Sequence, residues 1–274
     1  MSIEHDWGRD GFITIKGRAL ECVSFGPSPS DTATIILLHE GLGCVALWRD
    51  FPQRLSDATG CGVFVYSRAG YGQSDLDSLP RPLDYMTNEA VDVLPRVIDA
   101  IGAKKVILVG HSDGASIAAI YAGSFNDPRL GAIALLAPHF FTEPMGLAEI
   151  ERAKIVFETT DLPTKMGKYH RHPEHTFRGW NDSWLHPDFA TWDITDVIDY
   201  IRVPCLLIQG DQDQYGTMAQ LDVVQDRSYA PVDRVNIPDC KHAPFAEQPQ
   251  VTLDAIADFV AHLDRFDPLG RNAR

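Results

Sequence analysis

Residues 106–121 have the sequence VILVGHSDGASIAAIY, and this stretch decides the fold class. The apolar run at 106–109 is typical of a strand that is buried on both faces of a parallel sheet. The motif GHSDG follows it, and small apolar residues after the motif indicate a helix. The two glycines permit a sharp, strained turn in which a larger side chain would collide with the adjoining strand and helix. We therefore predict a strand, a turn and a helix, with Ser112 exposed at the tip of the turn.

Apolar runs and helical patterns alternate along most of the chain. Buried strands are expected at 34–38, 63–66, 106–109, 132–136 and 205–208, with a shorter strand at 234–237. An opening hairpin is expected at 12–15 and 20–25, and helices at 47–58, at 87–101 and from Pro249 onward. Pro95 interrupts the second helix and predicts a bend there. Alternating strands and helices predict an α/β fold with a mostly parallel sheet and helices on both faces.

The stretch 138–202 breaks this alternation. It is rich in Trp, His, Pro and charged residues and contains no convincing buried strand. A structureless loop of this length is uncommon in a compact domain, so we interpret the stretch as an inserted, mainly helical cap. The expected core then comprises residues 1–137 and 203–274.

Composition excludes several classes of function. Of the 274 residues 45% are apolar, and the formal net charge is -14, which disfavours nucleic acids and anionic membranes as partners. The polar N-terminus and the lack of a long apolar run favour a cytoplasmic location. The five scattered cysteines show no metal-binding or disulfide spacing, and we expect no metal and no cofactor. The sequence leaves open whether the chain forms a homo-oligomer.

A serine becomes a nucleophile at neutral pH only when a histidine takes its proton and a carboxylate orients that histidine. We expect His242, in a loop before the last helix, to be the base. Asp213, which ends the turn after the strand at 205–208, is the expected acid, with Asp211 and Glu143 as alternatives. A competing frame, Gly114-Ala115-Ser116-Ile117-Ala118, contains Ser116, which we assign to the helix interior.

Several segments together resemble the α/β-hydrolase superfamily along nearly the whole chain. They are the loop 37–43, the segment 66–74, the motif around Ser112, the turn 210–213 and the segment 242–249. The resemblance is greatest to small capped bacterial serine hydrolases, which include carboxylesterases, enol-lactonases, carbon–carbon bond hydrolases of aromatic degradation and cofactor-free perhydrolases. It implies an eight-stranded α/β-hydrolase sheet with a nucleophile elbow at Ser112.

The resemblance also implies an oxyanion hole, formed by backbone N–H groups that stabilise the negative charge of the reacting oxygen. One donor would be Gly41, with Leu42 as the alternative, and the second would be Asp113. The sequence departs from the family at Glu40, which stands where a glycine usually follows the histidine. An unpaired carboxylate there would repel anionic substrates, so Glu40 is expected to influence substrate charge.

The cap is expected to close the pocket over Ser112. Its aromatic residues could line an apolar acyl site or pack within the cap, and these are Phe177, Trp180, Trp184 and Trp192. The residues expected to contact a small-molecule substrate are Glu40, Leu42, His139, Trp180 and Trp184. The cap histidines His170, His172 and His175 lack a defined set of ligands for a metal.

These features favour a serine hydrolase that cleaves an ester, thioester or lactone of a small, largely apolar or aromatic acyl compound. The alternatives are a carbon–carbon bond hydrolase acting on a vinylogous diketone, a cofactor-free perhydrolase, and a small-molecule receptor with the same fold. A serine nucleophile argues against dehalogenase and epoxide hydrolase chemistry, which the superfamily performs with a carboxylate. Fold resemblance alone does not choose the substrate.

Overall fold

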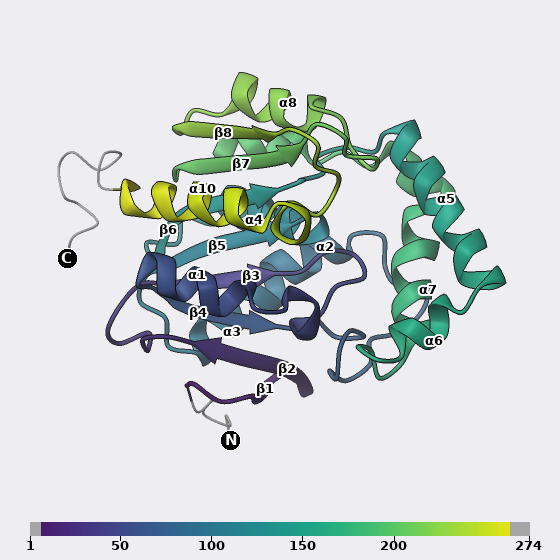
Figure 1. The fold of residues 1–274 in the computed structure, drawn as a ribbon, viewed down its shortest axis with the longest axis horizontal. Helices are drawn as coiled ribbons and strands as arrows, with labels where there is room; N and C mark the ends of the chain where they lie inside the picture. The colour runs from purple at the N-terminus through teal and green to yellow at the C-terminus, as the bar shows by residue number, and fades with distance from the viewer. Residues whose placement is uncertain (1–6, 264–274) are drawn as a thin grey trace.

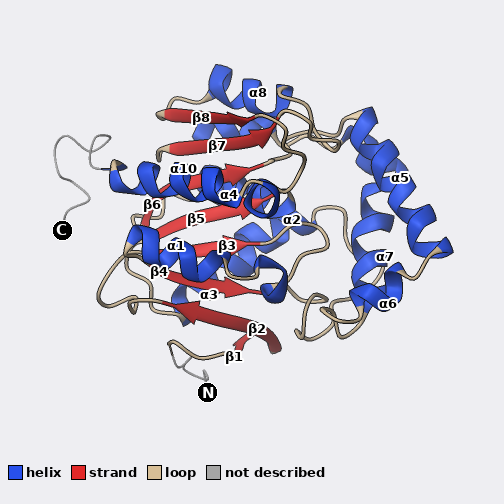
Figure 2. Ribbon diagram, in the orientation of Figure 1, coloured by secondary structure: helices blue, strands red, loops and turns tan. Residues whose placement is uncertain are grey.

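The computed structural model describes residues 7–263, and within them the chain forms an eight-stranded, mostly parallel sheet (Figures 1 and 2). The spatial order of the strands is β1-β2-β4-β3-β5-β6-β7-β8. Strands β1 and β2 form the predicted hairpin, β2 is antiparallel to β4, and the remaining pairs are parallel. The bounds are β1 (Gly11–Ile15), β2 (Arg18–Phe25), β3 (Thr34–Leu38), β4 (Gly62–Tyr66), β5 (Val106–His111), β6 (Leu130–Leu136), β7 (Cys205–Gly210) and β8 (Val232–Ile237). The predicted fold class is confirmed.

Helices cover both faces of the sheet because successive strand side chains point to opposite sides. In β3, Ile35 and Leu37 pack with α1 (Phe51–Thr59) and α10 (Pro249–Ala261). Ile36 and Leu38 belong to the other core, which contains α4 (Asp113–Ser124), α3 (Leu94–Ala100) and α8 (Ala219–Arg227). The two apolar layers hold the central strands rigidly, so the loops at the strand ends start from fixed positions.

The helix expected at 87–101 begins at Tyr85 and consists of three pieces. These are α2 (Tyr85–Asn88), a π-helical turn η2 (Glu89–Val93) and α3, in which Pro95 occupies the first turn. A proline has no N–H to donate and its ring clashes with the preceding turn of an α-helix. The wider π turn immediately before Pro95 accommodates both effects. The helix expected at 47–58 is also divided, into η1 (Val45–Trp48) and α1.

Between β6 and β7 the chain forms a helical insertion beside the ends of the sheet strands (Figure 1). Its elements are α5 (Pro144–Thr159), α6 (Leu162–Met166), α7 (Pro173–Trp184), η3 (Pro187–Thr191) and η4 (Thr195–Tyr200). The last turn, η4, returns to the core and packs on α4, where a Cβ at Gly123 would lie 2.4 Å from the carbonyl oxygen of Val197. The short α9 (Pro244–Glu247) precedes α10. Among the described residues, none of the helices has both the length and the apolar character needed to cross a bilayer.

At Gly114 the backbone of α4 lies against the end of β3. A Cβ there would lie 2.0 Å from the backbone oxygen of Leu38, and backbone atoms cannot move aside cheaply. Gly114→Ala is expected to lower the free energy of unfolding by about 1–3 kcal/mol. Gly131→Ala in β6 is the control, because its Cβ would meet its nearest neighbour at an ordinary 3.7 Å. Urea unfolding measures both variants, and equal midpoints would show that Gly114 does not limit the packing.

Candidate active site

Ser112 lies between the last residue of β5 and the first residue of α4, in a strained backbone conformation with φ 52° and ψ -118°. Its N–H donates to the carbonyl oxygen of Leu136 at 2.9 Å, which ties the turn to the neighbouring strand β6. A Cβ at Gly110 would lie 2.2 Å from the backbone oxygen of Gly114. The turn is therefore so tight that both flanking positions require glycine. Ser112 is buried and not exposed as predicted, because it lines a cavity at the strand ends.

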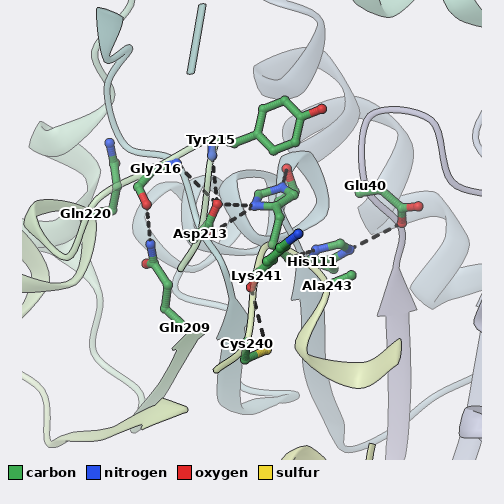
Figure 3. Close-up of polar contacts among 12 residues, drawn as sticks. Glu40, His111, Gln209, Asp213, Tyr215, Gly216, Gln220, Cys240, Lys241 and Ala243 are labelled. Atoms are coloured by element: carbon green, nitrogen blue, oxygen red, sulfur yellow. Dashed lines mark hydrogen bonds and ion pairs between the residues drawn. The ribbon is translucent and has the colours of Figure 1, made fainter. Parts of the chain in front are cut away.

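His242 connects Ser112 to Asp213. Its Nε2 lies 3.0 Å from Ser112 Oγ, and its Nδ1 lies 2.9 Å from each carboxylate oxygen of Asp213. Asp213 also accepts hydrogen bonds from the N–H groups of Tyr215, at 2.8 Å, and Gly216, at 3.3 Å (Figure 3). Burial opposes ionisation of Asp213, but His242 and the backbone donor of Tyr215 outweigh it and hold the pKa of this carboxyl below its usual value.

The alternative residues lie elsewhere. The carboxylate of Glu143 accepts hydrogen bonds from Thr217 and Gln220, at the edge of the cavity. Asp211 is exposed on the turn before Asp213. Ser116 lies inside α4, where its hydroxyl donates to the backbone oxygen of His139 at 2.6 Å. Of the three carboxylates considered from the sequence, the structure brings Asp213 to His242.

The loop after β3 presents backbone N–H groups to the same cavity. Gly41, Leu42 and Asp113 line it, and within residues 7–263 none of their three backbone N–H groups donates to another backbone or side-chain acceptor. The ring of Trp180 covers Gly41, where a Cβ would come 2.2 Å from it. These N–H groups are therefore available to an oxygen held above Ser112.

Arg68, which the sequence did not single out, holds this loop in place. Its guanidinium is buried and donates to the backbone oxygens of His39 and Glu40. The His39 ring donates to the Glu40 oxygen at 2.7 Å and accepts from the Arg68 N–H at 3.1 Å, and burial keeps the pKa of His39 well below its usual value. His170 of the cap donates to the Leu42 oxygen at 3.0 Å, so it links the cap to the loop.

The cavity has a volume of about 260 Å³. All five predicted substrate-contact residues line it: Glu40, Leu42, His139, Trp180 and Trp184. The sequence missed other lining residues, which include Leu147 and Ile150 of α5 and Tyr215 beside His242. The other two cap aromatics pack internally: Phe177 stacks on Phe157 with ring centroids 3.8 Å apart, and Trp192 stacks on Phe189 at 5.2 Å.

A buried polar network connects the turn at Ser112 to the helical insertion. The Asp113 carboxylate accepts a hydrogen bond from the Tyr85 hydroxyl, which in turn accepts from Trp184 Nε1 at 3.0 Å. The Arg81 guanidinium lies over the rings of Tyr85 and Tyr71. Burial outweighs these partners and raises the pKa of Asp113 above its usual value. His139, also on the cavity wall, has its pKa lowered to about 3 by burial and by the nearby His242.

Among the described residues, no cluster of His, Cys, Asp and Glu side chains is arranged to hold a metal ion. His170, one of the three cap histidines, uses both ring nitrogens in hydrogen bonds, to the Gly72 N–H and the Leu42 oxygen. The thiol of Cys240 is buried near His242, and burial raises its pKa to about 11. This thiol is therefore protonated at neutral pH and is a poor nucleophile.

The chain is similar to curated proteins over about half of its length. It is 29% identical over 145 residues to Epoxide hydrolase 3 of Siraitia grosvenorii, which is 53% of this chain and 43% of the relative. It is 27% identical over 136 residues to the 1-acylglycerol-3-phosphate O-acyltransferase ABHD5 of Rattus norvegicus, which is 50% of this chain and 38% of the relative. The chain thus spans less than half the length of these relatives.

Solved structures share the fold over most of the chain. Proline iminopeptidase of Mycobacterium smegmatis has a TM-score of 0.72 at 16% identity, covering 93% of this chain and 99% of that one. The enol-lactonase of Burkholderia xenovorans LB400 has a TM-score of 0.71 at 17% identity, covering 91% and 99%. The model of the alpha/beta hydrolase family matches residues 35–255, which include the turn at Ser112, the helical insertion and the loop of His242. The chain therefore belongs to the alpha/beta hydrolase family.

Proposed function

We propose that this protein is a serine hydrolase that cleaves an ester, thioester or lactone of a small, largely apolar or aromatic acyl compound. The observation that carries the proposal is the position of His242 between Ser112 Oγ, at 3.0 Å, and the Asp213 carboxylate, at 2.9 Å, on the wall of a cavity. Serine, histidine and carboxylate in this order form the arrangement that activates a hydroxyl for attack on a carbonyl.

In the first step Ser112 Oγ attacks the carbonyl carbon while His242 Nε2 takes its proton. The carbonyl π electrons move to the oxygen, which becomes an oxyanion and accepts hydrogen bonds from the N–H groups of Gly41 and Asp113. The Asp213 carboxylate accepts a hydrogen bond from the Nδ1–H of His242, so it selects the tautomer whose Nε2 is free to act as the base. It also stabilises the imidazolium that forms.

In the second step the oxyanion collapses and the bond to the leaving group breaks. His242 gives its proton to the departing alcohol, thiol or ring oxygen, and the acyl group stays on Ser112 as an ester. Water then enters, gives a proton to His242 and attacks the acyl carbon. Collapse of this second intermediate releases the carboxylic acid and returns the proton to Ser112 Oγ.

The choice of carbonyl substrates over epoxides follows from the nucleophile. Ser112 is the residue that lies against His242. A serine that opened an epoxide would form an ether, which water cannot hydrolyse under these conditions. The same serine attacking a carbonyl forms an ester, which the same base and oxyanion donors can hydrolyse. The partial similarity to epoxide hydrolases therefore does not extend to their reaction in this proposal.

The cavity favours a small apolar acyl group. Its volume is about 260 Å³, and apolar side chains of α5, α7 and the loop after β3 form much of its wall: Leu42, Leu147, Ile150, Trp180 and Trp184. Burial of apolar area contributes about 25 cal/mol per Å² to the binding free energy, so a hydrocarbon or aromatic acyl chain that fills this space would bind more tightly.

Ser112→Ala is expected to abolish turnover of p-nitrophenyl butyrate, lowering kcat/KM by at least about 1,000-fold, because the attacking oxygen is lost. Ser116→Ala, from the competing frame at residues 114–118, is the matched control and is expected to stay within about tenfold of the wild type. Initial rates of p-nitrophenol release measure both. Undiminished activity in Ser112→Ala would contradict the mechanism, and a wild type limited to a single turnover would indicate a receptor.

Leu147 offers a test of the acyl site. Leu147→Phe narrows the cavity and is expected to lower kcat/KM for p-nitrophenyl octanoate about tenfold more than for the acetate, since one or two methylenes of pocket space change kcat/KM by about this factor. Ile155→Phe, on an exposed position of the same helix α5, is the control. If the ratio of octanoate to acetate rates is the same in both variants, the acyl chain does not occupy this part of the cavity.

A further inference from the structure

Glu40 and His111 form a polar chain that reaches the backbone of His242. His111 Nδ1 lies 3.4 Å from Glu40 Oε2 (Figure 3). His111 Nε2 lies 2.7 Å from the carbonyl oxygen of His242. The His111 side chain is 2% exposed and that of Glu40 is 23% exposed. The Glu40 carboxylate also lies against Gly43, where a Cβ would come 2.4 Å from Oε2.

The acceptors on either side of His111 decide where its protons are. A carbonyl oxygen accepts only, so Nε2 must carry a proton to bond to it. An ionised carboxylate also accepts only, so Nδ1 must carry a proton as well. Both bonds therefore form together when His111 is an imidazolium and Glu40 is a carboxylate.

The surroundings of His111 support this ion pair. Burial alone would lower the pKa of His111, but the Glu40 carboxylate, the His242 carbonyl and Asp213 outweigh it and raise the pKa above its usual value. His111 in turn holds the pKa of Glu40 below its usual value despite burial. The other ionisable groups nearby are the His242 ring, with centroids 5.1 Å apart, His139, and Arg68 beside Glu40.

We propose that Glu40 and His111 are positioning residues, whose ion pair holds the His242 backbone so that its imidazole faces Ser112. This inference rests on the proposed role of His242 as the base. Glu40 precedes Gly41 and His111 precedes Ser112. This one pair of side chains therefore connects the loop of Gly41, the turn at Ser112 and the loop of His242. It also changes the expectation for Glu40: its carboxylate is paired, so it repels an anionic substrate less than an unpaired one would.

Loss of the His111 proton breaks this connection. A neutral imidazole has one N–H, which can serve either Glu40 or the His242 carbonyl. The cation is present below the raised pKa of His111 and disappears as the pH rises through it, so activity should fall on the alkaline side. In Glu40→Gln the amide can donate to Nδ1 of a neutral His111, whose Nε2–H still bonds to His242. That variant should keep its activity at alkaline pH.

The experiment is the pH profile of kcat/KM for p-nitrophenyl butyrate. We expect the wild type and Glu143→Gln, which changes another cavity carboxylate, to show a falling alkaline limb that Glu40→Gln lacks. An identical alkaline limb in Glu40→Gln, or no limb in the wild type, would overturn the inference. His111→Ala should lower kcat about tenfold with little change in KM, and His111→Gln should recover part of the loss by donating to the same carbonyl.

A readout without turnover separates this inference from the proposed function. NMR titration of the His111 imidazole, assigned by comparison with His111→Gln, should show a higher pKa in the Ser112→Ala protein than in the same protein with Glu40→Gln. Equal pKa values would rule out the ion pair even if the enzyme is an active esterase. If the two pKa values differ clearly but the wild type hydrolyses no ester, the ion pair is supported and the proposed reaction is rejected.

Discussion

The close approach of α4 to the ends of β3 and β5 is the constraint on which the site depends. Gly110 and Gly114 bring two backbone segments into contact, and Ser112 between them has φ 52° and ψ -118°. A backbone held in such a region costs about 1–3 kcal/mol, which the surrounding structure must supply. The buried strands and the bond from the Ser112 N–H to Leu136 supply it, so the position of Oγ is set before any substrate arrives.

The parallel sheet brings the other groups to this serine. Strands β3, β5, β7 and β8 all run in the same direction, so their carboxyl ends lie at one edge, where the loops holding Gly41, Ser112, Asp213 and His242 meet. In the described part of the chain no disulfide joins these loops, and hydrogen bonds from polar side chains fix their positions relative to one another. Arg68 donates to the carbonyl oxygens of the loop after β3, and the Asp113–Tyr85–Trp184 chain connects the turn at Ser112 to the helical insertion.

The sequence was sufficient to predict those parts of the structure that depend on local residue pattern and on the order of elements along the chain. The strand–turn–helix around Ser112 is a local signal, and Asp213 and His242 follow successive strands, so their loops could be placed at one edge. It was not sufficient for contacts between distant residues. His111 lies 71 positions from Glu40, and nothing in the pattern reveals that the two side chains meet. The sequence also does not show which side of each inserted helix faces the cavity. For this reason Phe177 and Trp192, which pack internally, could not be distinguished from Trp184, which lines the cavity. Leu147 was not recognised as a lining residue for the same reason.

We propose that His242 activates Ser112 as the nucleophile facing the cavity. The most direct measurement is labelling with a fluorophosphonate, followed by peptide mass spectrometry of the wild type and of His242→Ala. The account predicts a phosphonyl group on Ser112 in the wild type and labelling slowed by at least about 100-fold when the base is removed. Labelling of another residue, or an equal rate of labelling in His242→Ala, would contradict it.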